Sequence, residues 1–448
     1  MAMAVPTIIS QLVNLVYNMV DAFFIGRTGN SYMMAATTIT LTLTMLNVAF
    51  SNLFGVGGGS LVARLMGQNR SEDGRSVSAF SFYGSITLAL VYSVLVGLFT
   101  APVLRFLGAS DDTFAYAVQY TRLVIVLGSV PSILSMTLAH LLRNVGCAKE
   151  ASLGLSGGGI LNMLLDPLFM FVLLPKGNEV TGAALATLLS NVLACLYLLF
   201  AYRRASRGTP VSLSPRQALR VAKEECKSIF AVGIPSALLT GLFDLASISV
   251  NILAAAHSDL VLAGMGIVMK IERIPNAVNI GICQGMLPLV AYNYAAKNEA
   301  RMQQTIRTAR LYGLVVSAIS IVLLEVFAFP ASNLFLSTRA DQAETALLTV
   351  GYAALFLRIR CVASPVQFLN YHTSFCMQAM GKGKATLLHA AVRELVFYIP
   401  LMILLDHLFG EVGLAAALLL GETLGAIFAI LLLRHILNQR RSNPSTAS

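Results

Sequence analysis

Polar side chains recur at helical spacing inside several apolar segments of this chain. One segment carries Asn162 and Asp166 a helical turn apart with Pro167 directly after them, and the next carries Thr187 and Asn191 at the same spacing. Side chains at positions i and i+4 share one face of a helix, and the proline predicts a kink beside the carboxylate. Carboxylate, amide and hydroxyl oxygens are the ligands that a proton or a small hard cation takes.

The segment at the start of the chain carries a longer stripe of the same kind. Its polar residues stand at positions i, i+3, i+4 and i+7, and they are Asn14, Tyr17, Asn18 and Asp21. A helix places all four on one face. This segment therefore offers a second carboxylate to the groups above.

The composition identifies the medium around these helices. Hydrophobic residues make up 56% of the 448 residues and charged residues only 12%, whereas soluble domains carry about 25% charged residues. The deficit predicts a protein embedded in lipid. The net charge of +10 does not indicate a nucleic-acid partner, because the basic residues stand in short loops, as the positive-inside rule expects.

A membrane span needs about 20 mainly apolar residues, and the chain offers about twelve such segments. They are expected at 4–26, 33–65, 77–101, 114–142, 151–174, 181–202, 229–256, 262–293, 306–330, 347–380, 385–407 and 412–436. The predicted fold class is an all-α polytopic membrane protein. The first segment lacks a small-residue cleavage site, so no signal peptide is expected, and we expect a short basic tail to precede the first residue.

Basic residues are distributed unevenly between the two sides of the membrane. With the N-terminus inside, eighteen lysines and arginines between Arg70 and Arg441 fall in the inner loops. The outer loops hold four, namely Arg27, Arg105, Lys176 and Arg339. This asymmetry predicts that both termini are cytoplasmic.

The two halves of the chain echo one another. The offsets between matched positions are nearly constant, at 235 − 6 = 229 for two prolines, and 381 − 146 = 235 and 413 − 182 = 231 for two pairs of glycines. We therefore expect two six-helix lobes related by an internal repeat, as in many transporters. The predicted divisions are an N-lobe at 1–202, a cytoplasmic basic linker at 203–228, a C-lobe at 229–437 and a cytoplasmic tail at 438–448.

Ionisable groups inside the bilayer are functional candidates, because each costs about 2.5–3.5 kcal/mol on insertion scales. At a rise of 1.5 Å per residue, Asp21, Asp166 and Thr187 lie roughly 7–12 Å below the outer ends of their helices. With Asn162 they share one layer in the outer half of the membrane. We predict that these four residues bind a coupling cation, Na⁺ or H⁺, and we expect no cofactor, other metal or catalytic residue. Secondary candidates for a cavity or a second-lobe site are Tyr17, Asn18, Asn191 and Asp244.

The remaining intramembrane charges are expected to form buried ion pairs that hold the second bundle. They are crowded into three of the predicted helices and comprise Lys270, Glu272, Arg273, Arg358, Arg360, Arg393 and Glu394.

Two glycine-rich stretches imitate catalytic motifs. Residues 154–158 read Gly-Leu-Ser-Gly-Gly and match a nucleophile elbow around Ser156, but no strand precedes them. Residues 55–59 are glycine-rich without the lysine of a phosphate-binding loop. We interpret both stretches as close helix packing. The six cysteines show no disulfide or metal spacing.

These residues, with several further motifs, resemble the multidrug and toxic compound extrusion (MATE) family over nearly the whole chain. The motifs are Pro6, 21–26, Gly57, Arg64, Gly67, 143–146, 162–167, 182–187, 281–285, Pro288, 291–297, 378–382, Arg393 and Pro400. Alanines at 295–296 depart from the glycine that the family usually carries there.

The resemblance implies a V-shaped pair of six-helix lobes that export cationic or amphipathic drugs in exchange for Na⁺ or H⁺ by alternating access. It places the cation site in the N-lobe, at Asp21, Asn162, Asp166 and Thr187. The pattern is most similar to bacterial members. We therefore expect a cytoplasmic (inner) membrane location, small-molecule drugs and lipid as partners, and a functional monomer.

Two other classes of protein compete with this interpretation. A flippase for lipid-linked precursors of the same superfamily needs cavity cations for anionic pyrophosphates, and the candidates are Arg122, Arg358, Arg360 and Arg393. An intramembrane enzyme needs a nucleophile–base pair or an aspartyl dyad with a Gly-Asp motif, and no Gly-Asp dipeptide occurs in the chain.

The orientation generates a first prediction. Cysteines introduced at 203–227 should react with a membrane-impermeant thiol reagent only from the cytoplasmic side. Labelling of intact cells from outside would contradict the topology.

Overall fold

The computed structural model describes residues 3–334 and 343–442. Arg339 of the outer loops and residues 443–448 of the expected tail lie outside these ranges. Within them every regular element is a helix, which confirms the predicted fold class.

Ten helices form the first half of the chain. They are α1 (Ala4–Arg27), α2 (Ser31–Gly67), α3 (Ser71–Leu98), α4 (Thr100–Phe106), α5 (Asp111–Thr121), the π-helix η1 (Arg122–Leu127), α6 (Ser129–Asn144), α7 (Ala148–Pro167), the π-helix η2 (Leu168–Leu173) and α8 (Glu179–Ala205).

The described part of the second half of the chain is also built from helices. It holds α9 (Pro215–Ala218), α10 (Lys223–His257), α11 (Asp259–Ala295), α12 (Glu299–Val326), α13 (Ala328–Asn333), α14 (Ala343–Cys361), α15 (Ser364–Ala379), α16 (Gly383–Ala391), the π-helix η4 (Val392–Tyr398) and α17 (Ile399–Ser442).

The described helices account for the twelve expected spans. Nine helical segments are long and apolar enough to cross a membrane, and two bent pairs bring the number to eleven. One of the nine, Gly383–Gln439, has 57 residues, far more than the ~20 that one span needs. Because this segment folds back on itself at Gly410, it supplies two spans, and the described helices supply twelve.

The turn in that segment lies at Gly410. Its backbone adopts φ 60° and ψ −147°, which breaks the helix. On either side the chain runs antiparallel: a Cβ placed on Gly421 would lie 2.9 Å from Cα of Tyr398, and one on Gly425 would lie 2.9 Å from Cγ of Arg393. The two arms are therefore two spans joined by a helical hairpin.

The bends in the two bent pairs were not predicted. The α5–η1 helix meets α6 at 47°, and α14 meets α15 at 53°. Pro365 stands in the first turn of α15, where a proline is tolerated but cannot continue a preceding helix. At Pro167 the α-helix α7 ends and the π-helix η2 begins, and the two together form one apolar span, Ala148–Leu173. The kink expected there stays a prediction.

The chain packs into two compact units. The first comprises the described residues up to Ala237 together with Leu287–Glu299, and the second comprises Leu238–Met286 and the described residues from Ala300 onward. The lobe boundaries expected above stay a prediction.

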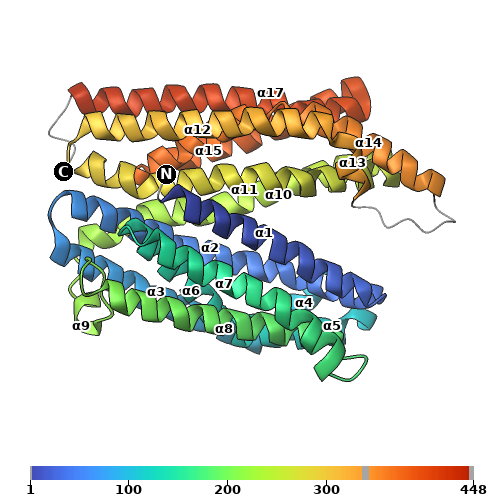
Figure 1. The fold of residues 1–448 in the computed structure, drawn as a ribbon, viewed down its shortest axis with the longest axis horizontal. Coiled ribbons are helices and arrows are strands. Elements are labelled where there is room, and N and C mark those ends of the chain that lie inside the picture. The colour runs from blue at the N-terminus through green and yellow to red at the C-terminus, as the bar shows by residue number, and fades with distance from the viewer. Residues whose placement is uncertain (1–2, 335–342, 443–448) are drawn as a thin grey trace. The chain divides into compact units, whose positions relative to one another are not determined.

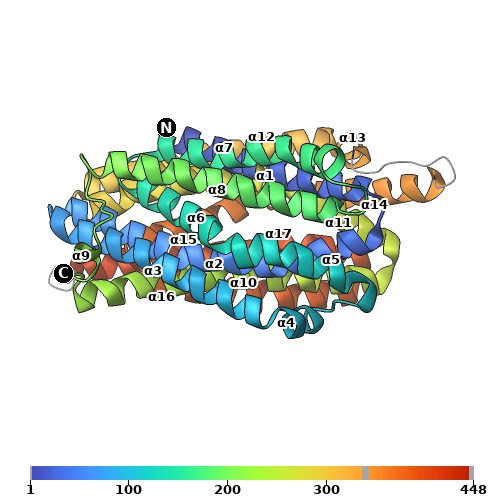
Figure 2. The same ribbon diagram turned by 90° about the horizontal axis from the view of Figure 1, so that it is seen from below.

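Helices α1, α7 and α8 lie side by side in the first unit (Figure 1), and the turned view shows the same neighbours (Figure 2). The basic stretch after α8 is packed on α3: the Tyr83 hydroxyl donates to the carbonyl of Leu213 at 2.8 Å. Arg70, between α2 and α3, pairs with Glu225 at 2.9 Å. The stretch is therefore a folded part of this unit.

The glycine-rich part of α2 is close-packed helix, as expected. A Cβ on Gly57 would lie 3.1 Å from Cα of Gly233 on α10, and one on Gly59 would lie 2.6 Å from Nδ2 of Asn144. Small residues let these backbones approach one another.

The helices keep apolar side chains on their outer faces. Leu98 is 72% exposed and Phe200 66%, and α12 passes the membrane-span criteria although only 11% of its apolar window is buried. Such faces are unfavourable in water and favourable in lipid. The packing therefore agrees with a multi-pass membrane protein.

The turn at Gly410 generates a second prediction. Gly410→Ala should destabilise the protein by about 1–3 kcal/mol, because side chains other than hydrogen are strained in this backbone region. Steric crowding does not contribute, since the added Cβ would meet only Cε1 of His257 at 3.9 Å. The thermal midpoint of unfolding in detergent measures the effect.

The matched control is Gly351→Ala in α14, where a Cβ meets nothing within 4 Å. It should leave the midpoint unchanged or raise it, because alanine favours a helix interior by up to about 1 kcal/mol. Equal midpoints for the two variants would contradict the turn assignment.

Candidate functional site

Three of the four predicted site residues are in contact between α7 and α8. The Asn162 amide donates to Oδ1 of Asp166 at 3.2 Å and to Oγ1 of Thr187 at 3.4 Å. Asp166 is fully buried and Asn162 is 3% exposed. The i, i+4 spacing on α7 thus brings amide and carboxylate together, and α8 adds the hydroxyl.

Asp21 completes the group from α1. Its carboxylate interacts electrostatically with Asp166, and its Oδ1 atom is buried. Among the described residues it makes no hydrogen bond to the other three. The structure therefore brings all four predicted residues together. Three of them are joined by hydrogen bonds, and Asp21 interacts with this group only electrostatically.

Glycines on α7 position the two neighbouring helices. A Cβ on Gly158 would lie 2.8 Å from Cβ of Ala194 on α8. A Cβ on Gly159 would lie 3.2 Å from Cγ1 of Val13 on α1. The absence of side chains at these points lets α1 and α8 approach α7 closely enough for Asp21 and Thr187 to face Asp166.

Carboxylate oxygens distinguish the site from the other buried polar atoms that lack a partner in the described residues, which are hydroxyl, amide, guanidinium and imidazole atoms. Among the described residues, Oδ1 of Asp21, Oδ1 of Asn162 and Oδ2 of Asp166 are buried and have no hydrogen-bond partner. Buried polar atoms without a partner are rare, since each costs about 1–3 kcal/mol. Three acceptors in one place fit a proton or a Na⁺ ion, which would satisfy them together.

Tyr120 is a fifth member that the sequence did not reveal. It reaches the site from α5, hydrogen-bonds with Thr187, and interacts electrostatically with both carboxylates. Its side chain is buried, with 7% exposed. Only another tyrosine, Tyr116, is polar among the residues one turn away, and no acidic or amide residue shares its helical spacing, so the pattern did not single it out.

The secondary candidates divide into two groups. Tyr17 packs against Gly159 and interacts electrostatically with Asp21 and Asp166, so it lines the site. Asn18 is exposed and donates back to the carbonyl of Asn14 at 2.6 Å. Asn191 is partly buried on α8.

Asp244 belongs to α10 in the second unit, apart from the residues above. It is exposed, and the basic group that acts on it is Arg273.

Ser156 also lies on α7, and its hydroxyl is buried without a hydrogen-bond partner in the described chain. A Cβ on the nearby Gly154 would lie 2.5 Å from Cδ2 of Leu198 on α8. The stretch packs helices together, in agreement with its interpretation above.

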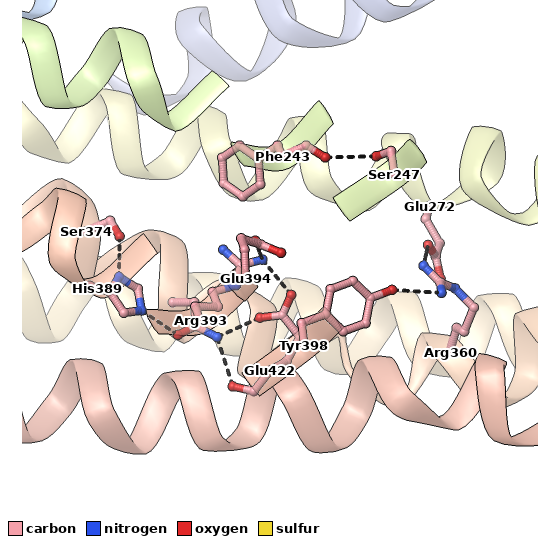
Figure 3. Close-up of polar contacts among 11 residues, drawn as sticks. Phe243, Ser247, Glu272, Arg360, Ser374, His389, Arg393, Glu394, Tyr398 and Glu422 are labelled. Atoms are coloured by element: carbon pink, nitrogen blue, oxygen red, sulfur yellow. Dashed lines mark hydrogen bonds and ion pairs between the residues drawn. The ribbon is translucent and has the colours of Figure 1, made fainter. Parts of the chain in front are cut away.

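The buried ion pairs expected in the second unit are present for Glu272, Arg360, Arg393 and Glu394, whereas Arg358 is 54% exposed and lies 3.8 Å from Glu325. Arg360 donates two hydrogen bonds of 2.9 Å to Glu272. Arg393 pairs with Glu422 at 2.5 Å and with Glu394 at 3.5 Å, as Figure 3 shows. In the sequence Glu422 is one more acidic residue inside a predicted span, and nothing there identifies Arg393 as its partner. No ion pair of Lys270 or Arg273 is found in the described residues.

The fold and this site define a polytopic helical membrane protein with buried acidic groups of the kind that secondary transporters use. The family model MatE matches residues 6–168 and 235–404. The chain therefore belongs to the MatE family.

Two curated relatives are similar over almost their full length. The multidrug export protein MepA of Staphylococcus saprophyticus is 28% identical over 432 residues, which cover 96% of this chain and 92% of the relative. MepA of Staphylococcus haemolyticus is 29% identical over 440 residues, covering 98% and 93%.

Solved structures share the fold. An outward-facing multidrug resistance MATE family transporter of the MOP superfamily has a TM-score of 0.91 at 23% identity, with 98% of this chain and 96% of that chain covered. A MATE transporter of Vibrio cholerae has a TM-score of 0.89 at 20% identity, with the same coverage.

The packing of α7 generates a third prediction. Gly158→Val should push α8 away and lower stability by about 1–3 kcal/mol, because the added atoms overlap Ala194. Gly157→Val is the control, since a Cβ there meets nothing within 4 Å. Thermal unfolding in detergent compares them, and equal loss of stability in both would contradict the packing described here.

Proposed function

We propose that this protein is a secondary active multidrug exporter that exchanges cationic or amphipathic drugs for Na⁺ or H⁺. The observation that carries the proposal is the set of buried, unsatisfied oxygens of Asp21, Asn162 and Asp166. Two carboxylates in a site of low dielectric repel each other strongly. A bound cation offsets that repulsion, so cation binding at this site is favourable.

The location of the site suggests how binding is coupled to movement. Asp21 lies on α1, whereas Asn162 and Asp166 lie on α7, and α1 packs on α7 across Gly159. A cation held by both helices favours the arrangement in which they are close. A ligand that prefers one of two conformations shifts the equilibrium towards it, so cation binding and release can drive alternating access.

Similarity to MepA supports drugs as the transported molecules, since both curated relatives are named multidrug export proteins. We place the protein in the bacterial cytoplasmic membrane as a monomer, with both termini inside. Transport requires no bond-making chemistry, and we assign no catalytic residue and no cofactor beyond the coupling ion.

The ion pairs of the second unit remove two of the four cavity cations that a flippase for anionic lipid precursors would use, while Arg122 and Arg358 are exposed. Arg360 is committed to Glu272 and Arg393 to Glu422. Both arginines are only 5% exposed. Neither guanidinium is available to a pyrophosphate without breaking a buried pair, which costs about 3–5 kcal/mol.

The coupling role generates a fourth prediction. Asp21→Asn and Asp166→Asn should each abolish cation-driven export while expression and drug binding persist, because the amide keeps the shape and removes the charge. Asn162→Ala and Thr187→Ala should weaken apparent cation affinity more than maximal rate, because neutral oxygens tune the site. Proteoliposomes with Na⁺ and pH gradients imposed separately measure both effects and identify the ion.

Wild-type export rates in both aspartate variants under either gradient would overturn the proposal. Asp244 would then be the next carboxylate to test.

A further inference from the structure

The second unit contains a buried cluster whose charges do not balance. Arg393 and Glu394 are consecutive on η4, and Glu422 reaches them from α17. Arg393 is 5% exposed and both glutamates are 2% exposed. One guanidinium therefore faces two carboxylates out of contact with water, which leaves one negative charge without a counter-ion.

The neighbouring pair of Glu272 and Arg360 is balanced in charge. Glu272 and Arg360 make two parallel hydrogen bonds of 2.9 Å, with one charge of each sign. Tyr398 contacts Arg360 at 3.5 Å between this pair and the cluster (Figure 3). Because this pair neutralises itself, it contributes no positive charge to Glu394.

The hydrogen bonds identify Glu422 as the ionised carboxylate. Its Oε2 accepts from the Asn370 amide at 2.6 Å, and its Oε1 accepts from Arg393 at 2.5 Å. The Asn370 carbonyl therefore faces Nε2 of His389 at 3.0 Å, and the Ser374 hydroxyl meets Nδ1 of His389 at 2.9 Å. A neutral His389 with its proton on Nε2 satisfies these contacts, and the backbone of Gly425 is a further hydrogen-bond partner of the ring. Because His389 is 1% exposed and has no carboxylate partner among these contacts, burial favours its neutral form.

Glu394 has much weaker support. Its contact with Arg393 is 3.5 Å, longer than a charge-assisted hydrogen bond. The other groups that act on it are Glu422, Tyr371 and Tyr398, and none of these is a cation. A buried carboxylate in this position is more stable with a proton than as an uncompensated charge.

One hydrogen-bond donor of Arg393 is unused. Its Nε is buried and has no acceptor among the described residues, while Phe243 and Tyr371 hold the guanidinium with ring centroids at 5.2 and 5.4 Å. Its Nη2 group donates to Glu422, and the guanidinium also hydrogen-bonds with Tyr371. If Glu394 ionises, this unused N–H is available to it. The π-helical turn that carries both residues is a type of segment found frequently at functional sites.

We propose that Glu394 is a proton-binding group of the second unit, which exchanges its proton while Arg393 serves as the counter-ion of the ionised form. The proposal extends the proposed export function, since it adds an ion-carrying group outside the α1–α7–α8 site. A proton fits better than Na⁺, because a guanidinium 3.5 Å from the carboxylate repels a metal ion, whereas a proton bonds directly to one oxygen.

Infrared spectroscopy of the purified full-length protein tests the proposal without relying on transport. At neutral pH the wild type should show the C=O stretch of a neutral carboxylic acid, which Glu394→Gln removes. Glu422→Gln should also weaken this band, because Arg393 no longer has Glu422 as its partner and becomes the counter-ion of an ionised Glu394. Glu325→Gln is the control, because that carboxylate is 41% exposed and lies 3.8 Å from Arg358. The Glu394 band should disappear at alkaline pH and return on reacidification.

Two results would overturn the proposal: a spectrum unchanged by Glu394→Gln, or a band that survives at alkaline pH. Folding is monitored by thermal unfolding, in which Glu394→Gln should keep or raise the midpoint and Glu272→Gln should lower it by leaving Arg360 unpaired. In the double variant Asp21→Asn/Asp166→Asn the band should persist although export is lost, which separates this proposal from the proposed function.

Discussion

A carboxylate buried in a membrane protein must be paired, hydrogen-bonded or neutralised, and this constraint organises both units. The bilayer offers no water to solvate it, and the penalty for an uncompensated buried charge is several kcal/mol. In the second unit Glu272 satisfies the constraint with Arg360 at 2.9 Å. In the first unit Asp21 and Asp166 face each other without a basic partner among the contacts of the described residues. A carboxylate paired inside its unit, such as Glu272, holds helices together, whereas one without a full partner depends on a cation from outside.

Backbone geometry decides where these charges stand. Glycines on α7 remove the side chains that would keep α1 and α8 away, and the turn at Gly410 folds one long helical segment into two spans. That hairpin brings Glu422 of α17 against Arg393 of η4, 29 residues apart in the chain. The positions of the buried charged groups therefore depend on places where a helix is interrupted or carries glycine.

Much of this arrangement is predictable from the residues alone, because helical periodicity and hydropathy are local properties. The twelve apolar segments coincide with helices or helix pairs, and the i, i+4 spacing of Asn162 and Asp166 predicts their contact. Contacts between helices are not local. The sequence contains no sign that Tyr120 of α5 reaches Thr187, or that Glu422 rather than Glu394 takes the short bond to Arg393. The bend at Gly128 was hidden, since hydropathy continues through it without interruption. The bend at Pro365 has a signal in the sequence, the proline itself, which a prediction based on hydropathy alone does not use.

The central claim is that the site formed by Asp21, Asn162, Asp166 and Thr187 binds the coupling cation. The most direct test is the thermal midpoint of the purified protein as a function of Na⁺ concentration at constant ionic strength, and separately of pH. A ligand that binds only the folded state raises stability as its concentration increases. The account predicts that the wild-type midpoint rises with one of the two ions and that the double variant Asp21→Asn/Asp166→Asn loses this response. The same dependence in both proteins would contradict the claim.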